Sequence, residues 1–126
     1  MIPSLNQISV IGRAVRMTRI LHSDWPYYAP HHKKITLIEF SIELARPHHP
    51  GRGEIHCTAY FTREDLGVFE RNVNQAHQAM MILGSLDPIP YTDKALNENR
   101  VLANQVELIP QCTILKSHPA VIPHLS

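Results

Sequence analysis

The stretch from Leu5 to Arg16 constrains the fold most, because it predicts an extended chain that has to bend. Ile8, Val10 and Gly12 fall on one face of a strand, since neighbouring side chains of an extended chain point to opposite faces. An isolated glycine such as Gly12 inside a strand is typical of a bulge or of a close approach by another backbone segment. Strands that curl around a small barrel need such a position. We therefore predict that residues 5–16 form the first, strongly curved strand of a closed β structure.

A hairpin and a helix are predicted next. Residues 35–45 alternate between apolar and polar positions, and the Pro- and Gly-rich turn at 46–53 separates them from a third strand at 54–61. Thr62 then precedes two acidic residues, which favour the positive end of a helix dipole while the threonine caps free N–H groups. An apolar stripe at three-to-four spacing follows and predicts a short helix that packs on the barrel: Leu66, Phe69, Val73 and Ala76.

The order of these elements predicts an OB-fold. Two more strands are expected at 79–86 and 101–110, which places the helix between the third and fourth of five strands. This is the layout of the OB-fold, a partly open Greek-key barrel that often binds oligonucleotides. We predict an all-β chain with one short helix, a domain over 1–110 and an extended tail over 111–126, where the patterning is weak.

Basic residues are concentrated in the first part of the chain. The net charge is only +1, yet residues 1–52 hold seven Lys or Arg against three acidic residues. Such asymmetry allows a basic surface on a nearly neutral protein, as a phosphate backbone requires. The alternative is that these charges are scattered and only keep the protein in solution. The seven residues are Arg13, Arg16, Arg19, Lys33, Lys34, Arg46 and Arg52.

A long loop rich in aromatic residues is predicted at 17–34. Pro26 and Pro30 argue against a helix or a central strand there. Aromatic rings beside basic side chains suit a contact that combines base stacking with charge. The alternative is that the rings fold back on the core or pack against another subunit. The residues concerned are Trp25, Tyr27 and Tyr28, with Lys33 and Lys34 close by.

Neither a metal site nor a catalytic site is expected. Nine histidines are present, but the pairs His31–His32 and His48–His49 are adjacent and would point apart in a strand, whereas zinc needs converging ligands. Solvated loop histidines are the preferred interpretation. The chain lacks a GxSxG elbow, a Walker loop, a GxGxxG motif and an HExxH motif. We expect no cofactor and no enzymatic activity.

Cysteine usage and the N-terminus favour a cytoplasmic setting. Cys57 and Cys112 form no disulfide framework, which favours a reduced environment. Residues 1–4 lack a basic region followed by an apolar block, so no secretory signal is expected. No apolar run approaches the length that spans a membrane.

Four segments, at 5–13, 40–45, 54–61 and 80–86, together resemble the first four strands of bacterial-type single-stranded DNA-binding proteins. The resemblance covers roughly residues 4 to 110. It implies an OB-fold that assembles as a homo-oligomer, usually a tetramer, and wraps single-stranded DNA in replication, recombination or repair. By position, Phe61 matches an aromatic residue on which a base stacks, Tyr91 falls near another, Arg13 matches a basic position and His56 matches a histidine near subunit contacts.

The sequence departs from this family at several points. Ile55 and the region of His48 stand where the family places stacking tryptophans. Each lost platform removes about 1–3 kcal/mol of binding, so we expect weaker affinity than the family norm. The glycine-rich linker and acidic tip of the family are absent, and this short form is also similar to primosomal replication protein N and to the short cyanobacterial and plastid proteins of this type.

Two functions therefore remain open. One is single-stranded DNA binding, and the other is a protein–protein interaction module with weak or no nucleic-acid affinity. The residues expected to contact DNA are Arg13, Arg16, Arg19, Trp25, Tyr27, Tyr28, Lys33, Lys34, Arg46, Arg52, Phe61 and Tyr91. Contacts between subunits are expected at Ile8, Val10, His56 and Met81.

Overall fold

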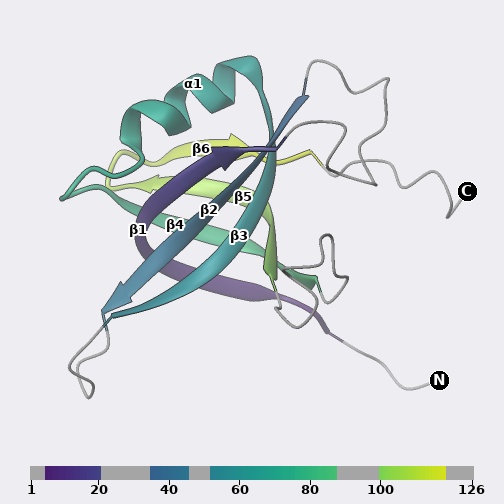
Figure 1. Cartoon of the computed structure of the whole chain (residues 1–126), viewed down its shortest axis with the longest axis vertical. Coiled ribbons are helices and arrows are strands. Elements are labelled where there is room, and N and C mark those ends of the chain that lie inside the picture. Colours follow the sequence, from purple (N-terminus) through teal and green to yellow (C-terminus); the bar gives the residue numbers. More distant parts are fainter. Residues whose placement is uncertain (1–4, 21–34, 46–51, 88–99, 119–126) are drawn as a thin grey trace, which may run out of the picture.

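The computed structural model describes residues 5–20, 35–45, 52–87 and 100–118 of the chain (Figure 1). Strands account for most of these residues, with one short helix between the third and fourth strands. The elements are β1 (Ile8–Arg19), β2 (Ile35–Ala45), β3 (Arg52–Thr62), α1 (Arg63–Asn72), β4 (Ala79–Asp87), β5 (Arg100–Ile109) and β6 (Thr113–Lys116).

The first five strands close into a ring. β1 pairs antiparallel with both β2 and β4, β2 pairs with β3, and β4 pairs with β5. A short parallel pairing of Cys57 with Val101 and Thr58 with Leu102 joins β3 to β5 and completes the barrel. α1 packs over one end of it, against β2, β3 and β6 (Figure 1). The predicted all-β class and OB-fold layout are confirmed.

The core follows the predicted alternation of β2. Ile38, Phe40 and Ile42 point inward and are buried, and the helix closes the end of the barrel with Phe69. The Phe69 ring stands 4.9 Å from Phe40. Thr62 caps the helix as predicted, because its hydroxyl accepts a hydrogen bond from the backbone N–H of Asp65 at 3.3 Å.

β1 bends as predicted, although the irregularity lies beyond the glycine. A Cβ on Gly12 would lie 2.5 Å from the carbonyl oxygen of Glu43, so the expected close approach is confirmed. The ladder with β2 is interrupted between Val15 and Thr18, and Arg16 has a φ of 59°. β1 therefore pairs with β4 through its first half and with β2 through its second. It continues to Arg19, into the range predicted as loop.

The C-terminal part of the described chain is folded, where an extended tail was predicted from residue 111. β6 pairs with β5, and Leu115 is buried in the core. Tyr60 donates its backbone N–H to the hydroxyl of Ser117, and its carbonyl accepts from His118 N, both at 2.9 Å. These contacts make residues up to 118 part of the folded barrel. The sequence did not reveal this, because a four-residue strand is too short to show a period.

Candidate nucleic-acid interface

The outward side of β2 and β3 is the surface that OB-folds use to bind oligonucleotides, together with the β1–β2 and β4–β5 connections. Alternation along the two strands decides which side chains belong to this surface, here called the β2–β3 face. Its members are Leu37, Glu39, Ser41, Glu43, Glu54, His56, Thr58 and Tyr60.

Acidic and basic side chains balance each other at one end of the β2–β3 face. Arg13 reaches Glu43, with Nη2 3.9 Å from Oε2, and Arg16 donates from Nε to Oε1 of Glu54 at 2.8 Å. The hydrogen bond and the charge of Glu54 raise the pKa of Arg16 above its ordinary value. Its side chain is 71% exposed, and exposed ion pairs of this kind are weak enough for a phosphate to replace the carboxylate.

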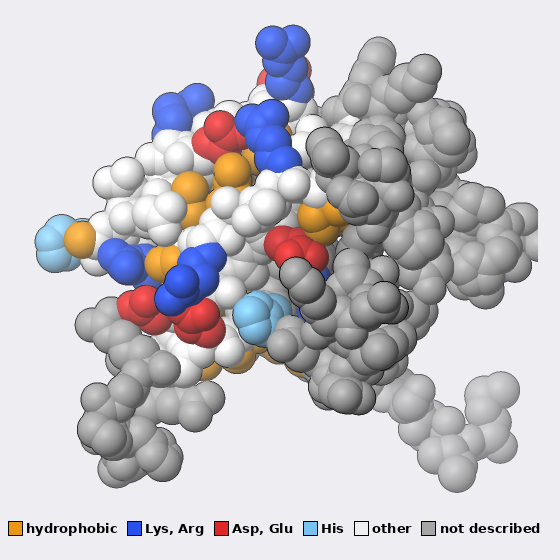
Figure 2. Space-filling view, in the orientation of Figure 1, with side chains coloured by type: hydrophobic (Ala, Val, Ile, Leu, Met, Phe, Trp, Pro, Cys, Tyr) orange, Lys and Arg blue, Asp and Glu red, His pale blue; other side chains and the backbone are white. Residues whose placement is uncertain are grey.

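The wider surface shows the same mixture of charge. On the side of the molecule in Figure 2, Lys and Arg side chains lie beside Asp and Glu side chains and form no continuous basic patch among the described residues. Where the predicted basic surface would include Arg13 and Arg16, each of these arginines forms an ion pair with a glutamate.

The other end of the β2–β3 face is apolar and lies where two connections begin and end. Leu37 and Tyr60 are buried together, and Ile20, Ile35 and Leu102 pack against them. Ile20 N also donates to the carbonyl oxygen of Leu37 at 2.9 Å. Ile20 and Ile35 bound the β1–β2 connection, and Leu102 lies near the start of β5. The flanks of the β1–β2 and β4–β5 connections therefore meet on this face.

Polar groups lie between these two ends. Arg100, at the start of β5, forms an ion pair with Glu39. Thr58 is fully buried, and its hydroxyl oxygen has no hydrogen-bond partner in the described part of the chain. The hydroxyl of Ser41 lies 3.3 Å from Nδ1 of His56, whose side chain is exposed. Sequence reasoning missed Glu39 and Arg100, although the alternation of β2 places Glu39 opposite its apolar face.

Two predicted contact residues lie elsewhere. Phe61 is fully buried and its ring packs 5.4 Å from Phe69, so the prediction that it stacks on a base is wrong for the folded barrel. Ile55, Cys57 and Ala59 share its face of β3, and this alternation could have identified it as a core residue. Arg19 pairs with Glu70 of α1, whereas Arg13 and Arg16 pair with glutamates of β2 and β3.

The predicted subunit contacts are divided between the inside and the outside of the barrel. Ile8 and Val10 are partly buried and pack against the core, and their role in subunit contacts stays a prediction. Met81 lies across from Ile11 on the outer side of β1 and β4, and Ile11 is 55% exposed. His56 belongs to the β2–β3 face.

The structure does not describe the side chains of the remaining predicted contacts. Arg52 begins β3, and its side chain is not described. Those that fall outside the described ranges are Trp25, Tyr27, Tyr28, Lys33, Lys34, Arg46 and Tyr91.

The described ranges also bear on metal binding, membrane insertion and thiol chemistry. No group of three His, Cys, Asp or Glu residues in them is placed to hold a metal ion. No helix in this part of the chain combines the length and the hydropathy needed to cross a membrane. Cys57 and Cys112 are free thiols, and burial raises the pKa of Cys57 to about 12.

No family model matches the chain, and no curated protein matches it.

Proposed function

We propose that the chain is a non-catalytic single-stranded DNA-binding protein that binds through its β2–β3 face. The observation that carries the proposal is the meeting of Ile20, Ile35 and Leu102 on Leu37 and Tyr60. Because Ile20 and Ile35 bound the β1–β2 connection and Leu102 follows the β4–β5 connection, the first starts and ends beside this face and the second ends there. OB-folds bind oligonucleotides at this place.

The distribution of aromatic residues supports the same surface. The aromatic residues in the described ranges, Phe40, Tyr60, Phe61 and Phe69, are all buried. The other four belong by sequence to the two connections: Trp25, Tyr27, Tyr28 and Tyr91. Stacking of a base on such a ring contributes about 1–3 kcal/mol. In this proposal the rings stack on bases, and Arg13 and Arg16 exchange their carboxylate partners for phosphates.

Self-association is part of the proposal, with a homotetramer favoured over a dimer. Ile11 and Met81 form a cross-strand pair on the outer side of β1 and β4, and Ile114 of β6 is 47% exposed on the same sheet. Contact between copies would remove these apolar side chains from water. Light scattering at micromolar concentration tests this, and a monomer would contradict it. The proposed setting is the cytoplasm, in DNA replication, recombination or repair.

Fluorescence of Trp25, the single tryptophan, provides the test of DNA binding. Titration with oligo-dT at two salt concentrations should quench the emission, with affinity falling as salt rises because phosphate binding releases counterions. Arg16→Gln should weaken binding and flatten the salt dependence. Lys116→Gln is the matched control, since Lys116 lies on β6 and bonds to Gln105. Absence of quenching at low salt would reject the proposal.

A protein–protein interaction module is the second candidate. It is favoured by the pairing of Arg13, Arg16 and Arg100 with glutamates, which leaves the β2–β3 face without a net basic charge from these residues. A partner protein with mixed charges would suit such a surface. Quenching with a clear salt dependence would argue against this candidate.

A further inference from the structure

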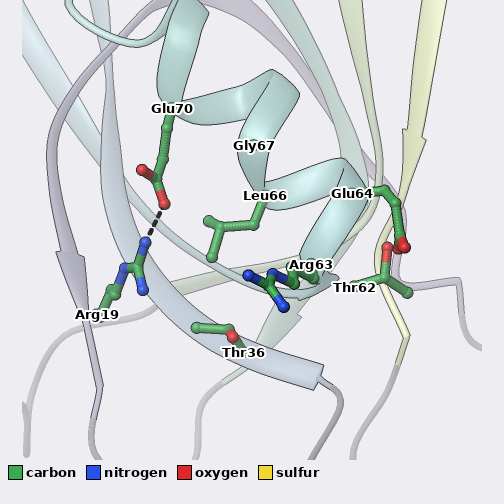
Figure 3. A pocket seen from close by; sticks show the side chains of 8 residues that line it. All are labelled: Arg19, Thr36, Thr62, Arg63, Glu64, Leu66, Gly67 and Glu70. Carbon is green, nitrogen blue, oxygen red and sulfur yellow. Dashed lines mark hydrogen bonds and ion pairs between the residues drawn. The ribbon is translucent and has the colours of Figure 1, made fainter.

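A second candidate site lies away from the β2–β3 face. A pocket of about 930 Å³ opens between the first turns of α1 and the ends of β1, β2 and β3 (Figure 3). Its volume is at the upper end of the range for small-molecule sites. Its charged lining residues are Arg19, Arg63, Glu64 and Glu70, and Thr36, Thr62, Leu66 and Gly67 complete the lining.

The two arginines of this pocket differ in their partners. Arg19 pairs with Glu70, as the dashed line in Figure 3 marks. Arg63 has neither an ion pair nor a hydrogen bond with any residue in the described ranges, and its guanidinium extends into the pocket below Leu66. The carboxylates of Glu64 and Glu70 also line the hollow, so its formal charge is balanced, and Arg63 is the guanidinium that an anion can contact without displacing a carboxylate.

The walls of the pocket leave space for a ligand that carries such an anion. Leu66 supplies an apolar surface, and Thr36 adds a hydroxyl on the opposite side in Figure 3. Gly67 contributes no side chain, and a Cβ built there would meet only Nη1 of Arg71, at 3.5 Å. The other hydroxyl in the lining, that of Thr62, accepts the helix-capping hydrogen bond from the N–H of Asp65.

We propose that this pocket binds the phosphate group of a phosphomonoester of nucleotide size. A guanidinium presents a planar fork of donors that matches phosphate oxygens, and two forks from different elements can share the three terminal oxygens of one group. Arg63 is the principal contact of the phosphate. Arg19 is the second contact, and it keeps its ion pair with Glu70. Leu66 and Gly67 border the part of the ligand beyond the phosphate.

The proposal is independent of DNA binding on the β2–β3 face. The charged residues of the pocket come from α1 and from the end of β1, whereas Arg13 and Arg16 pair with β2 and β3. An oligo-dT without terminal phosphates tests the β2–β3 face, and a mononucleotide tests the pocket. Either site can fail without the other.

The experiment follows backbone amide shifts by NMR during titration with deoxyadenosine 5′-monophosphate, inorganic phosphate or deoxyadenosine. The nucleotide and inorganic phosphate should shift the amides of Arg63, Leu66 and Gly67 in a saturable way, and deoxyadenosine should leave them in place. Tighter binding of the nucleotide would identify it as the better source of the phosphate. Arg63→Gln should weaken nucleotide binding at least tenfold, and Lys116→Gln should not.

Two results would overturn the proposal. One is an equal loss of nucleotide affinity in Arg63→Gln and Lys116→Gln, which would mean that binding depends only on the net charge of the protein. The other is an equal response to deoxyadenosine and its monophosphate. Gly67→Gln is a second variant that fills the hollow without changing charge, and it should also block binding. Thermal unfolding confirms that each variant is folded, as expected for the exposed Arg63.

Discussion

Glu43 of β2 and Glu54 of β3 lie directly opposite each other in the antiparallel ladder, on the outer side of the barrel. Like charges at opposed positions destabilise a sheet. Arg13 and Arg16 of β1 offset this repulsion, because each places a guanidinium beside one of the two carboxylates. The arginines that a phosphate backbone would contact therefore also stabilise the β2–β3 pairing.

Replacing Glu54 by glutamine should strengthen DNA binding. The change removes a negative charge from the β2–β3 face and leaves Arg16 with a neutral amide oxygen, which a phosphate displaces more readily than a carboxylate. We expect affinity for oligo-dT to rise by about twofold to fivefold, while the salt dependence stays the same because Arg16 contacts a phosphate in both proteins. Fluorescence titration at several salt concentrations measures both. Glu107→Gln, on β5 opposite Met81, is the matched control. Equal gains in the two variants would mean that only net charge matters.

Phe61→Leu should lower stability and leave DNA affinity unchanged. The Phe61 ring is fully buried and packs on Phe69, so the smaller side chain leaves a cavity beneath the helix. We expect a loss of about 1–3 kcal/mol in the free energy of unfolding, measured by urea denaturation. Binding is compared at a temperature where both proteins are folded. A large loss of affinity at unchanged stability would return Phe61 to the binding surface.

Alanine at two glycines should change stability in opposite directions. A Cβ on Gly84 would lie 2.1 Å from the carbonyl oxygen of Leu102, and this backbone atom cannot move without breaking the β4–β5 ladder. Gly84→Ala should cost about 3 kcal/mol or more. Gly67, in α1, has room for a methyl group, so Gly67→Ala should add about 0.5–1 kcal/mol. Denaturation midpoints measure both changes in stability. Similar shifts in the two variants would contradict the prediction made from the Cβ distances.

The buried thiol of Cys57 should make the protein less stable in alkali. Burial raises its pKa from 9.0 to about 12, so above pH 9 the unfolded chain loses this proton while the folded protein keeps it. Stability must then fall by about 1.4 kcal/mol per pH unit between these values. Cys57→Ala should remove this part of the slope in denaturation curves at pH 8, 9 and 10. An unchanged slope would show that other groups cause it.

The residues that the sequence placed correctly are those with strong local signals. The alternation of β2 identified its buried face, and Thr62 with Asp65 identified the start of the helix. Gly12 identified the close contact with Glu43, because a strand position without a side chain is where another backbone segment can approach. These signals come from residues that are close in the sequence, so they can be interpreted without the tertiary structure.

The features that were missed depend on partners distant in the sequence. Arg16 adopts a positive φ although it is not a glycine, and it does so at the irregularity between Val15 and Thr18 in the ladder with β2. The pairing of Arg13 and Arg16 with glutamates of β2 and β3 follows from register, which composition cannot reveal. β6 has only four residues, so its place beside β5 could not be seen as a pattern.

The contact of Ser117 and His118 with Tyr60 has a consequence for any shortened form of the chain. β5 covers the edge of β3 at Cys57 and Thr58, and the residues after β6 occupy both backbone groups of Tyr60. A protein that ended at Pro110 would expose the backbone groups of Tyr60, the edge of β5 that β6 covers and the core that Leu115 covers. Open strand edges join to one another, so such a truncation invites aggregation, and a fusion partner is better attached beyond residue 118.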